Sequence, residues 1–239
     1  SLGYKVKNPQ ANCFAPPPQE DGPSEQETKM TLITGGDFDL LGAPIGSAEW
    51  CEEYMERKLD SFQASLDELI SLPNTQVALT LLRSCEGFAR MVFYMRAIGH
   101  AGARQYPSSC DTRIEKCLAR LLGFSSDKLP EAARTQATLP VRLGGLGIRR
   151  SADHWHSAAL AASSSNYALC CRLDKKFVWD QEGWSQTATA YNESTSPNWL
   201  VCSRERPPRG LEQRSLSYGI VTATHNRLLD ESDAVDKAR

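Results

Sequence analysis

The sequence lacks the long apolar runs, leader segments and ligand clusters that define membrane, secreted and zinc-binding proteins. No apolar run reaches the roughly 18 residues that cross a bilayer, and no secretory signal stands at the front. Eight cysteines are present, but none forms a C-x-x-C pair, and no histidine follows at a zinc-finger spacing. We therefore expect an intracellular protein, in the cytoplasm or nucleus, that is not secreted, contacts no membrane and keeps its cysteines as buried free thiols.

Motifs for nucleophilic or phosphate chemistry are also missing. No G-x-S-x-G is present, and Cys170-Cys171 has no evident histidine partner. The glycines of 144–147 lack the Gly-Lys-Ser/Thr ending of a phosphate-binding loop and the spacing of a dinucleotide-binding one. His154 and His156 diverge by about 200° on a helix and do not converge on one ion. The sequence predicts no catalytic residue, no metal ligand and no cofactor in this chain.

Asp37 and Asp39 are the strongest metal candidates, because they form a D-x-D beside Gly35-Gly36. Carboxylates are the ligands that Mg²⁺ prefers. Alternate residues of a strand point to opposite faces, however, and no further acidic residue lies close by. We interpret the segment as a structural turn. The alternative, a small metal-dependent enzyme that uses both aspartates, stays open at this point.

The charge is nearly balanced overall and uneven along the chain. The formal net charge is −2. Acidic side chains dominate residues 49–68, whereas arginine and lysine dominate residues 83–150. A local basic face can bind phosphates even when the whole chain is slightly acidic. The alternative explanation for the basic segment is an ordinary solvated helix surface.

Periodicity indicates a mainly α protein, a helical bundle preceded by a small β-hairpin. Residues 15–31 are rich in Pro, Glu and Gln, which predicts a flexible loop. Two short apolar runs, 31–34 and 38–41, stand on either side of Gly35-Gly36 and fit a hairpin. Beyond Ala48 the apolar spacing becomes helical. We interpret Asp111 as the N-terminal cap of a helix. Residues 174–210 show no clear apolar period. The expected helices cover 48–72, 74–98, 111–122, 127–137, 154–173 and 211–229.

Three segments together resemble a known enzyme family. They are LGAPIG (41–46), LLRSCEGFARMVFYMR (81–96) and LPVRLGGLGIRRSADHWHSAALAAS (139–163). In this order they resemble the reverse transcriptases of non-long-terminal-repeat (LINE-like) retroelements, in the part that follows the catalytic aspartates. The resemblance covers roughly residues 1–170. In segment 2–14, Gly3, Asn8 and Cys13 match a palm motif in kind, although the motif's lysine is missing.

The resemblance implies a domain organisation. Residues 1–47 are then the end of a palm domain, residues 48–150 a thumb-like helical bundle, and residues 151–239 a helical linker or connection region. The hairpin would be the primer grip, which holds the primer 3′ end. Its residues are Leu41, Gly42, Ala43, Pro44, Ile45 and Gly46.

The resemblance also implies a function. The family's three catalytic aspartates are expected before Ser1, and the chain begins without Met, so we expect a fragment of an RNA-directed DNA polymerase that grips the template–primer duplex but is inactive alone. Mg²⁺ would belong to the complete polymerase, and the missing palm and fingers of the same polyprotein would be partners. A non-enzymatic α-helical interaction module derived from a retroelement is the alternative. The residues expected to contact the nucleic-acid backbone are Arg83, Arg90, Arg142, Gly144, Gly145, Arg149 and Arg150.

Overall fold

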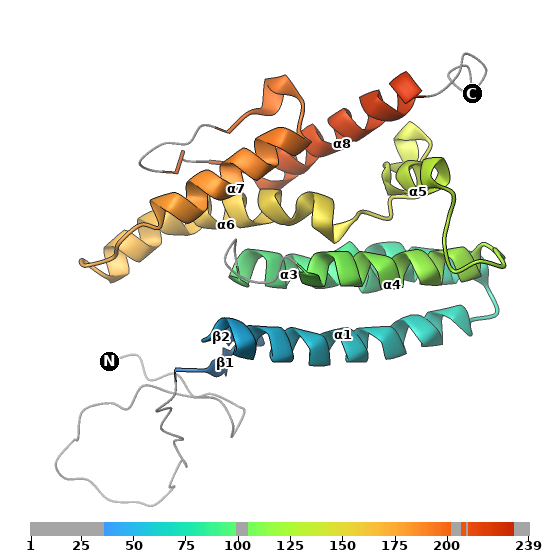
Figure 1. Ribbon diagram of the computed structural model, residues 1–239, viewed down its shortest axis with the longest axis horizontal. Helices are drawn as coiled ribbons and strands as arrows, with labels where there is room; N and C mark the ends of the chain where they lie inside the picture. The colour runs from blue at the N-terminus through green and yellow to red at the C-terminus, as the bar shows by residue number, and fades with distance from the viewer. Residues whose placement is uncertain (1–35, 99–104, 202–206, 209, 232–239) are drawn as a thin grey trace, which may run out of the picture.

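The computed structural model describes residues 36–98, 105–201, 207–208 and 210–231 (Figure 1). Over these ranges the chain is mainly helical, with a two-stranded antiparallel hairpin before the helices, which confirms the expected fold class. The predicted palm motif of 2–14 and loop of 15–31 lie outside the described residues. Within the described part, no helix is both long and apolar enough to span a bilayer.

The hairpin pairs β1 (Phe38–Leu40) with β2 (Ala43–Ile45), and a cap fixes it to the first helix. Leu41 and Gly42 form the turn with φ of 54° and 88°. The predicted run of 38–41 therefore pairs with the residues that follow it, whereas its predicted partner run, 31–34, lies outside the described residues. Helix α1 (Ala48–Ile70) begins after Ser47, whose hydroxyl accepts a hydrogen bond from the Trp50 amide at 3.3 Å. The Tyr54 hydroxyl lies 2.8 Å from the Gly42 carbonyl oxygen, so the hairpin sits directly on α1.

The helix expected over 74–98 is wrong as a single element. The chain forms α2 (Thr75–Leu81), a π-helical turn (Leu82–Glu86) and, after Gly87, α3 (Phe88–Ile98). Gly87 has φ −94° and ψ −131°, which lies outside the helical region. A Cβ atom at this position would lie 2.6 Å from the Leu82 carbonyl oxygen. The apolar period runs through this break, and for that reason periodicity alone did not reveal it.

The expected cap at Asp111 is also wrong, because α4 (Gln105–Leu121) begins six residues earlier. Asp111 instead accepts two backbone hydrogen bonds at the start of α6 (Ser151–Leu173). Between these helices lies the short α5 (Glu131–Thr138), followed by a glycine-rich turn. The cap therefore joins two helices that are far apart in sequence.

Helix α6 takes part in both clusters of buried side chains. Figure 1 shows the helices in layers, with α1 at one edge, then α3 and α4, then α6 with α7 (Gln181–Ser194), and α8 (Gln213–Glu231) at the other edge. Trp155 and Ala158 of α6 pack with α1, α3 and α4, whereas Leu160 and Ala161 pack with α7 and α8. The weak pattern after Leu173 concealed α7, whose Trp184 and Tyr191 are fully buried.

Candidate nucleic-acid interface

The primer-grip-like segment forms an ordered turn with an apolar outer edge. Ala43 and Pro44 are buried, while the Leu41 side chain is 88% exposed and Ile45 is 40% exposed. Gly42 takes the left-handed conformation that the turn requires, and Gly46 closes the strand. The hairpin therefore offers apolar side chains rather than charged groups to whatever it contacts.

Both carboxylates of the D-x-D stabilise this hairpin. Asp37 accepts the Ser47 amide hydrogen bond at 2.6 Å. Asp39 accepts the Gly42 amide at 2.7 Å and faces the Tyr54 hydroxyl at 2.9 Å. Burial and the Asp39 carboxylate raise the pKa of Tyr54, which keeps the phenol protonated as a donor. Among the described residues, no group of three or more His, Cys, Asp or Glu side chains could hold a metal ion. The geometry favours the structural interpretation of both aspartates.

The two candidate histidines occupy different environments. His154 is 4% exposed, and its ring meets the Phe88 ring edge-on at 5.2 Å. Burial, with a smaller effect of Arg149, lowers the pKa of His154 to about 3, so the ring is neutral at physiological pH. His156 instead lines a cavity beside Trp155 and Thr187. The two rings do not converge on a common site.

Two of the predicted backbone-contacting arginines have partners inside the protein. Arg90 pairs with Glu86, donates to the Ser65 hydroxyl at 3.1 Å and lies over the Phe62 ring. Arg150 lies 3.8 Å from Asp111 and 3.5 Å from Asp153. Both guanidinium groups are paired with carboxylates inside the protein. We therefore assign them to stabilising the fold and not to binding a ligand.

Three other predicted arginines are exposed cations. Within the described part of the chain, none of Arg83, Arg142 and Arg149 forms an ion pair, and all three are exposed. The Arg142 guanidinium lies 5.3 Å from the centre of the Tyr218 ring, and that of Arg149 lies 5.6 Å from the centre of the Phe88 ring. Contact with an aromatic face holds a guanidinium in place without neutralising it.

The glycine-rich turn positions these arginines and does not itself present free amides. The Gly144 amide donates to the Val141 carbonyl oxygen at 3.0 Å, and the Gly145 amide donates to that of Pro140 at 3.2 Å. A Cβ atom at Gly145 would lie 2.0 Å from the Leu139 carbonyl oxygen. Close packing therefore explains Gly145, and a left-handed φ of 76° explains Gly144. The amides of both glycines are not available as phosphate donors.

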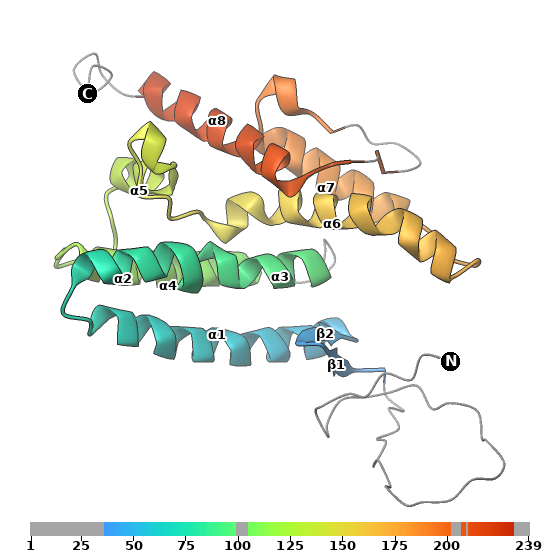
Figure 2. The ribbon, with the colours of Figure 1, turned by 180° about the vertical axis from the view of Figure 1, so that it is seen from behind.

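Helices α3 and α8 lie on either side of α6 and define one face of the molecule (Figure 2). We call this the α3–α8 face; its cationic residues are Arg83, Arg96, Arg142 and Arg149. The sequence of α3 contains no Asp or Glu, and α8 contains none before Asp230. Arg96 is exposed and donates to the Gln213 side chain at 3.1 Å, which ties the end of α3 to the start of α8. Arg96 was not singled out from the sequence, because only the fold brings it to this face.

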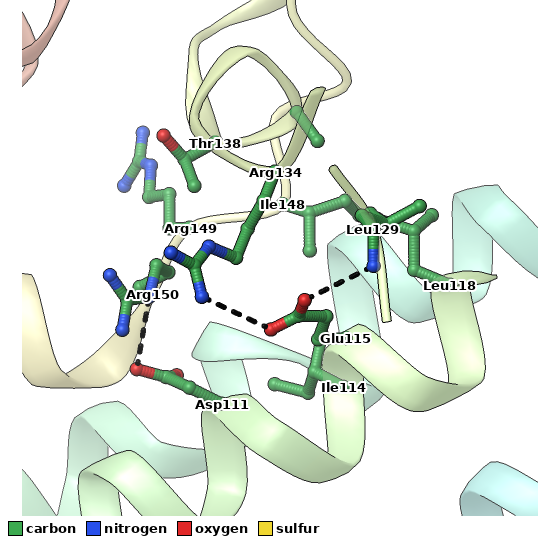
Figure 3. A pocket seen from close by; sticks show the side chains of 11 residues that line it. Asp111, Ile114, Glu115, Leu118, Leu129, Arg134, Thr138, Ile148, Arg149 and Arg150 are labelled. Atoms are coloured by element: carbon green, nitrogen blue, oxygen red, sulfur yellow. Dashed lines mark hydrogen bonds and ion pairs between the residues drawn. The ribbon is translucent and has the colours of Figure 1, made fainter. Parts of the chain in front are cut away.

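Figure 3 shows a small cavity lined by two carboxylates, Asp111 and Glu115, and three arginines, Arg134, Arg149 and Arg150. Glu115 accepts the Leu129 amide at 3.3 Å and lies 3.8 Å from the Arg134 guanidinium. Burial raises the pKa of Asp111 to about 6, although two backbone donors and Arg150 oppose the shift. Arg149 points away from both carboxylates (Figure 3). Internal partners therefore occupy both carboxylates of the cavity, whereas the Arg149 guanidinium has no carboxylate partner in the described part of the chain and can meet an external anion.

Comparison with protein-family models, with curated proteins and with solved structures gives no match. The function is therefore argued from the residues of this chain. The geometry divides the predicted contacts into internal groups, which are Arg90, Arg150 and the two glycines, and external groups, which are Arg83, Arg142 and Arg149.

Proposed function

We propose that this chain is the duplex-gripping part of an RNA-directed DNA polymerase, and that its α3–α8 face contacts the backbone of the template–primer duplex. The observation that carries the proposal is the set of exposed arginines, Arg83, Arg142 and Arg149, none of which has a carboxylate partner in the described part of the chain. They lie beside helices without acidic residues along most of their length. Such a face attracts a polyanion although the whole chain carries a net charge of −2.

Arginine side chains fit the task of holding a duplex of any sequence. A polymerase has to translocate along its template, so its grip depends on phosphates and sugars rather than on base edges. A guanidinium donates in a planar fork that matches two phosphate oxygens. The Phe88 and Tyr218 rings under Arg149 and Arg142 restrict the motion of those side chains, which reduces the entropy lost on binding.

The hairpin has a complementary role in this proposal. It lies at the start of α1 and presents Leu41 and Ile45 outward, where they would support the primer 3′ end against a palm that the described residues do not include. Phosphoryl transfer would occur on that palm with two Mg²⁺ ions held by its aspartates. This chain would position the duplex, and the palm would supply the chemistry.

Fluorescence anisotropy with a labelled RNA–DNA hybrid tests the proposal. We expect the affinity to fall steeply between about 50 mM and 200 mM salt, since each phosphate contact contributes a slope of about −0.9 in log K against log salt. A homoduplex of different sequence should bind with similar affinity. Binding that is absent at low salt, or that does not respond to salt, would overturn the proposal.

Matched variants locate the interface. R83A/R149A removes two cations of the α3–α8 face, whereas R57A/K58A removes two exposed cations of α1, the helix at the edge of the molecule opposite α8. Arg57 and Lys58 also lie over an aromatic ring, that of Tyr54, so both double variants remove a contact between a cation and a ring. We expect R83A/R149A to lower the affinity at least about tenfold and to reduce the salt slope by about 2. R57A/K58A should change neither. Equal effects of both double variants would mean nonspecific charge attraction.

The interaction-module alternative has an observation of its own. An apolar depression of about 210 Å³ lies between the end of α4 and the glycine-rich turn, with Leu122, Phe124 and Leu146 between 37% and 42% exposed. A helix from another protein would bury these side chains. L122S/F124S separates the two functions: it should leave hybrid binding intact if the chain grips duplex, and abolish a protein complex if the chain is a module.

A further inference from the structure

The turn between α6 and α7 projects beyond the rest of the bundle (Figure 2), and its exposed side chains form an unusual set. We call residues 172–178 the α6–α7 turn. Arg172, Lys175 and Lys176 are exposed in it, and no ion pair neutralises them within the described part of the chain. Leu173 is 76% exposed and Val178 is 85% exposed. A turn whose role is only to reverse the direction of the chain does not require two exposed aliphatic side chains among three cations.

Internal hydrogen bonds and ring contacts hold the α6–α7 turn in one conformation, so its exposed side chains have a defined arrangement. The Asp174 carboxylate accepts the Lys176 amide at 2.8 Å, and the Asp174 amide donates to the Cys170 carbonyl oxygen at 2.9 Å. Beneath the turn, the Tyr167 ring packs edge-on against the rings of Phe177 and Trp179, with centres 6.4 Å and 5.2 Å apart. These internal contacts fix the turn without help from Leu173 or Val178.

The position of the turn relates it to the α3–α8 face. Helix α6 begins directly after Arg149 and Arg150 and has 23 residues, which corresponds to a length of about 34 Å. One turn of B-form DNA measures roughly 34–36 Å, so the length of α6 is on the scale of one turn of a nucleic-acid duplex. Arg96 lies between the two ends, since its partner Gln213 starts α8 and Leu211 contacts Ser164 midway along α6. Cations thus occur at the start, along the middle and at the end of α6.

We infer that the α6–α7 turn is a second nucleic-acid contact, which meets the duplex about one helical turn away from the α3–α8 face. Arg172, Lys175 and Lys176 would neutralise phosphates there, and Leu173 and Val178 would lie against the sugars and base edges of the minor groove. Apolar side chains flanked by cations have this role in proteins that bind the minor groove. The inference rests on the proposed function and extends it to a second contact point.

The test compares two duplex lengths on the complete 239-residue chain. A hybrid of about 24 base pairs exceeds two helical turns and reaches both contacts, whereas one of roughly 8 base pairs is shorter than one turn and reaches only one of them. K175A/K176A should weaken binding of the long hybrid about tenfold and reduce its salt slope by about 2, with a much smaller effect on the short hybrid, which binds mainly at the α3–α8 face. R57A/K58A again serves as the control, because it also removes two adjacent cations.

A second variant examines the aliphatic pair. L173S/V178S removes apolar area from exposed positions, so the fold should be unaffected. We expect weaker binding of the long hybrid by about threefold to tenfold with an unchanged salt slope, since no phosphate contact is lost.

The outcomes separate this inference from the proposed function. If R83A/R149A weakens binding but neither turn variant does, the inference fails and the proposed function stands. If R83A/R149A has no effect on hybrid affinity, the proposed function is wrong, and the inference that rests on it is wrong as well. Equal losses for long and short hybrids would exclude a second contact one turn away. Wild-type binding to phosphatidylserine-containing vesicles that K175A/K176A abolishes, without any change in hybrid affinity, would assign the turn to a lipid surface and overturn the inference.

Discussion

The Asp111 carboxylate in α4 accepts the Ser151 backbone amide at 2.6 Å and the Ala152 amide at 2.9 Å. A side chain from one helix therefore caps the start of another, which lies 40 residues further along the chain. The first amides of a helix have no partner within it, so an acceptor from outside is needed. Because α6 belongs to both buried clusters, this cap fixes the position of the entire second half of the bundle relative to the first.

Removing the Asp111 carboxylate should destabilise the protein. D111A leaves two amides at the start of α6 without their acceptor, in a site where Asp111 is 7% exposed. We expect a loss of about 2–3 kcal/mol in the free energy of unfolding, measured by urea denaturation. D60A is a suitable control, because the Asp60 side chain is 80% exposed and 3.5 Å from its partner Arg113. Near-native stability of D111A would show that water or another group replaces the cap.

The same carboxyl group should make stability depend on pH. Its pKa rises from 3.8 in a model compound to about 6 in the protein, mainly because it is buried. The folded state therefore binds the proton more tightly than the unfolded state, and the stability gained from protonation is lost as the pH rises from about 4 to 6. The shift corresponds to at most about 3 kcal/mol.

The neutral variant D111N provides the comparison for that pH dependence. Other carboxyl groups, including Asp153 with its raised pKa, contribute their own dependence in both proteins. The difference in unfolding free energy between wild type and D111N should therefore fall with rising pH across the window from about 4 to 6. A difference that is constant or that rises with pH would mean that the amide donors outweigh burial at Asp111.

The Gly87 break between the π-helical turn and α3 depends on the absence of a side chain. In G87A the new methyl group would lie 2.6 Å from the Leu82 carbonyl oxygen, so the backbone has to shift. We expect a loss of about 1–3 kcal/mol, read as a lower thermal midpoint. S84A changes an exposed residue of the same π-helical turn and should leave the midpoint unchanged. If G87A is as stable as S84A, the chain forms the straight helix that its apolar period suggests.

The sequence predicted the elements whose signals are local. Apolar spacing located most helices and the strand Phe38–Leu40. The observed hairpin turn lies at Leu41-Gly42, whereas the sequence suggested a hairpin around Gly35-Gly36. The failures arise from contacts between distant segments. Asp111 looks like a local cap because its partners, Ser151 and Ala152, are 40 and 41 residues away. Helix α7 has few apolar residues apart from its buried aromatics, so its period is weak.

For the candidate site, too, the sequence revealed the local signal but not the contacts between distant segments. The basic segment of 83–150 was evident from composition, but its arginines look alike in sequence. Only the fold shows that Arg90 and Arg150 have carboxylate partners, and that Phe88 and Tyr218 hold Arg149 and Arg142 at the surface. Those aromatic partners come from other segments, so no motif could have revealed them.

This division of the arginines leads to a prediction that compares Arg83, in the π-helical turn, with Arg90, in α3. Arg90 contacts Glu86, Ser65 and the Phe62 ring, whereas Arg83 is exposed with no ion pair in the described part of the chain. R90A should therefore lower the free energy of unfolding by about 1–2 kcal/mol. R83A should stay within about 0.5 kcal/mol of wild type.

Duplex affinity should show the reverse order. R83A removes an exposed cation and should weaken binding to an RNA–DNA hybrid at low salt, while R90A, measured well below its unfolding midpoint, should bind nearly as well as wild type. Urea denaturation and anisotropy on the same two proteins separate the roles, because Arg83 and Arg90 differ by seven positions and carry the same charge. If R90A weakens binding more than R83A does, Arg90 exchanges its Glu86 partner for phosphate, and the interface lies on the α1 side of α3 and not on the side of α8.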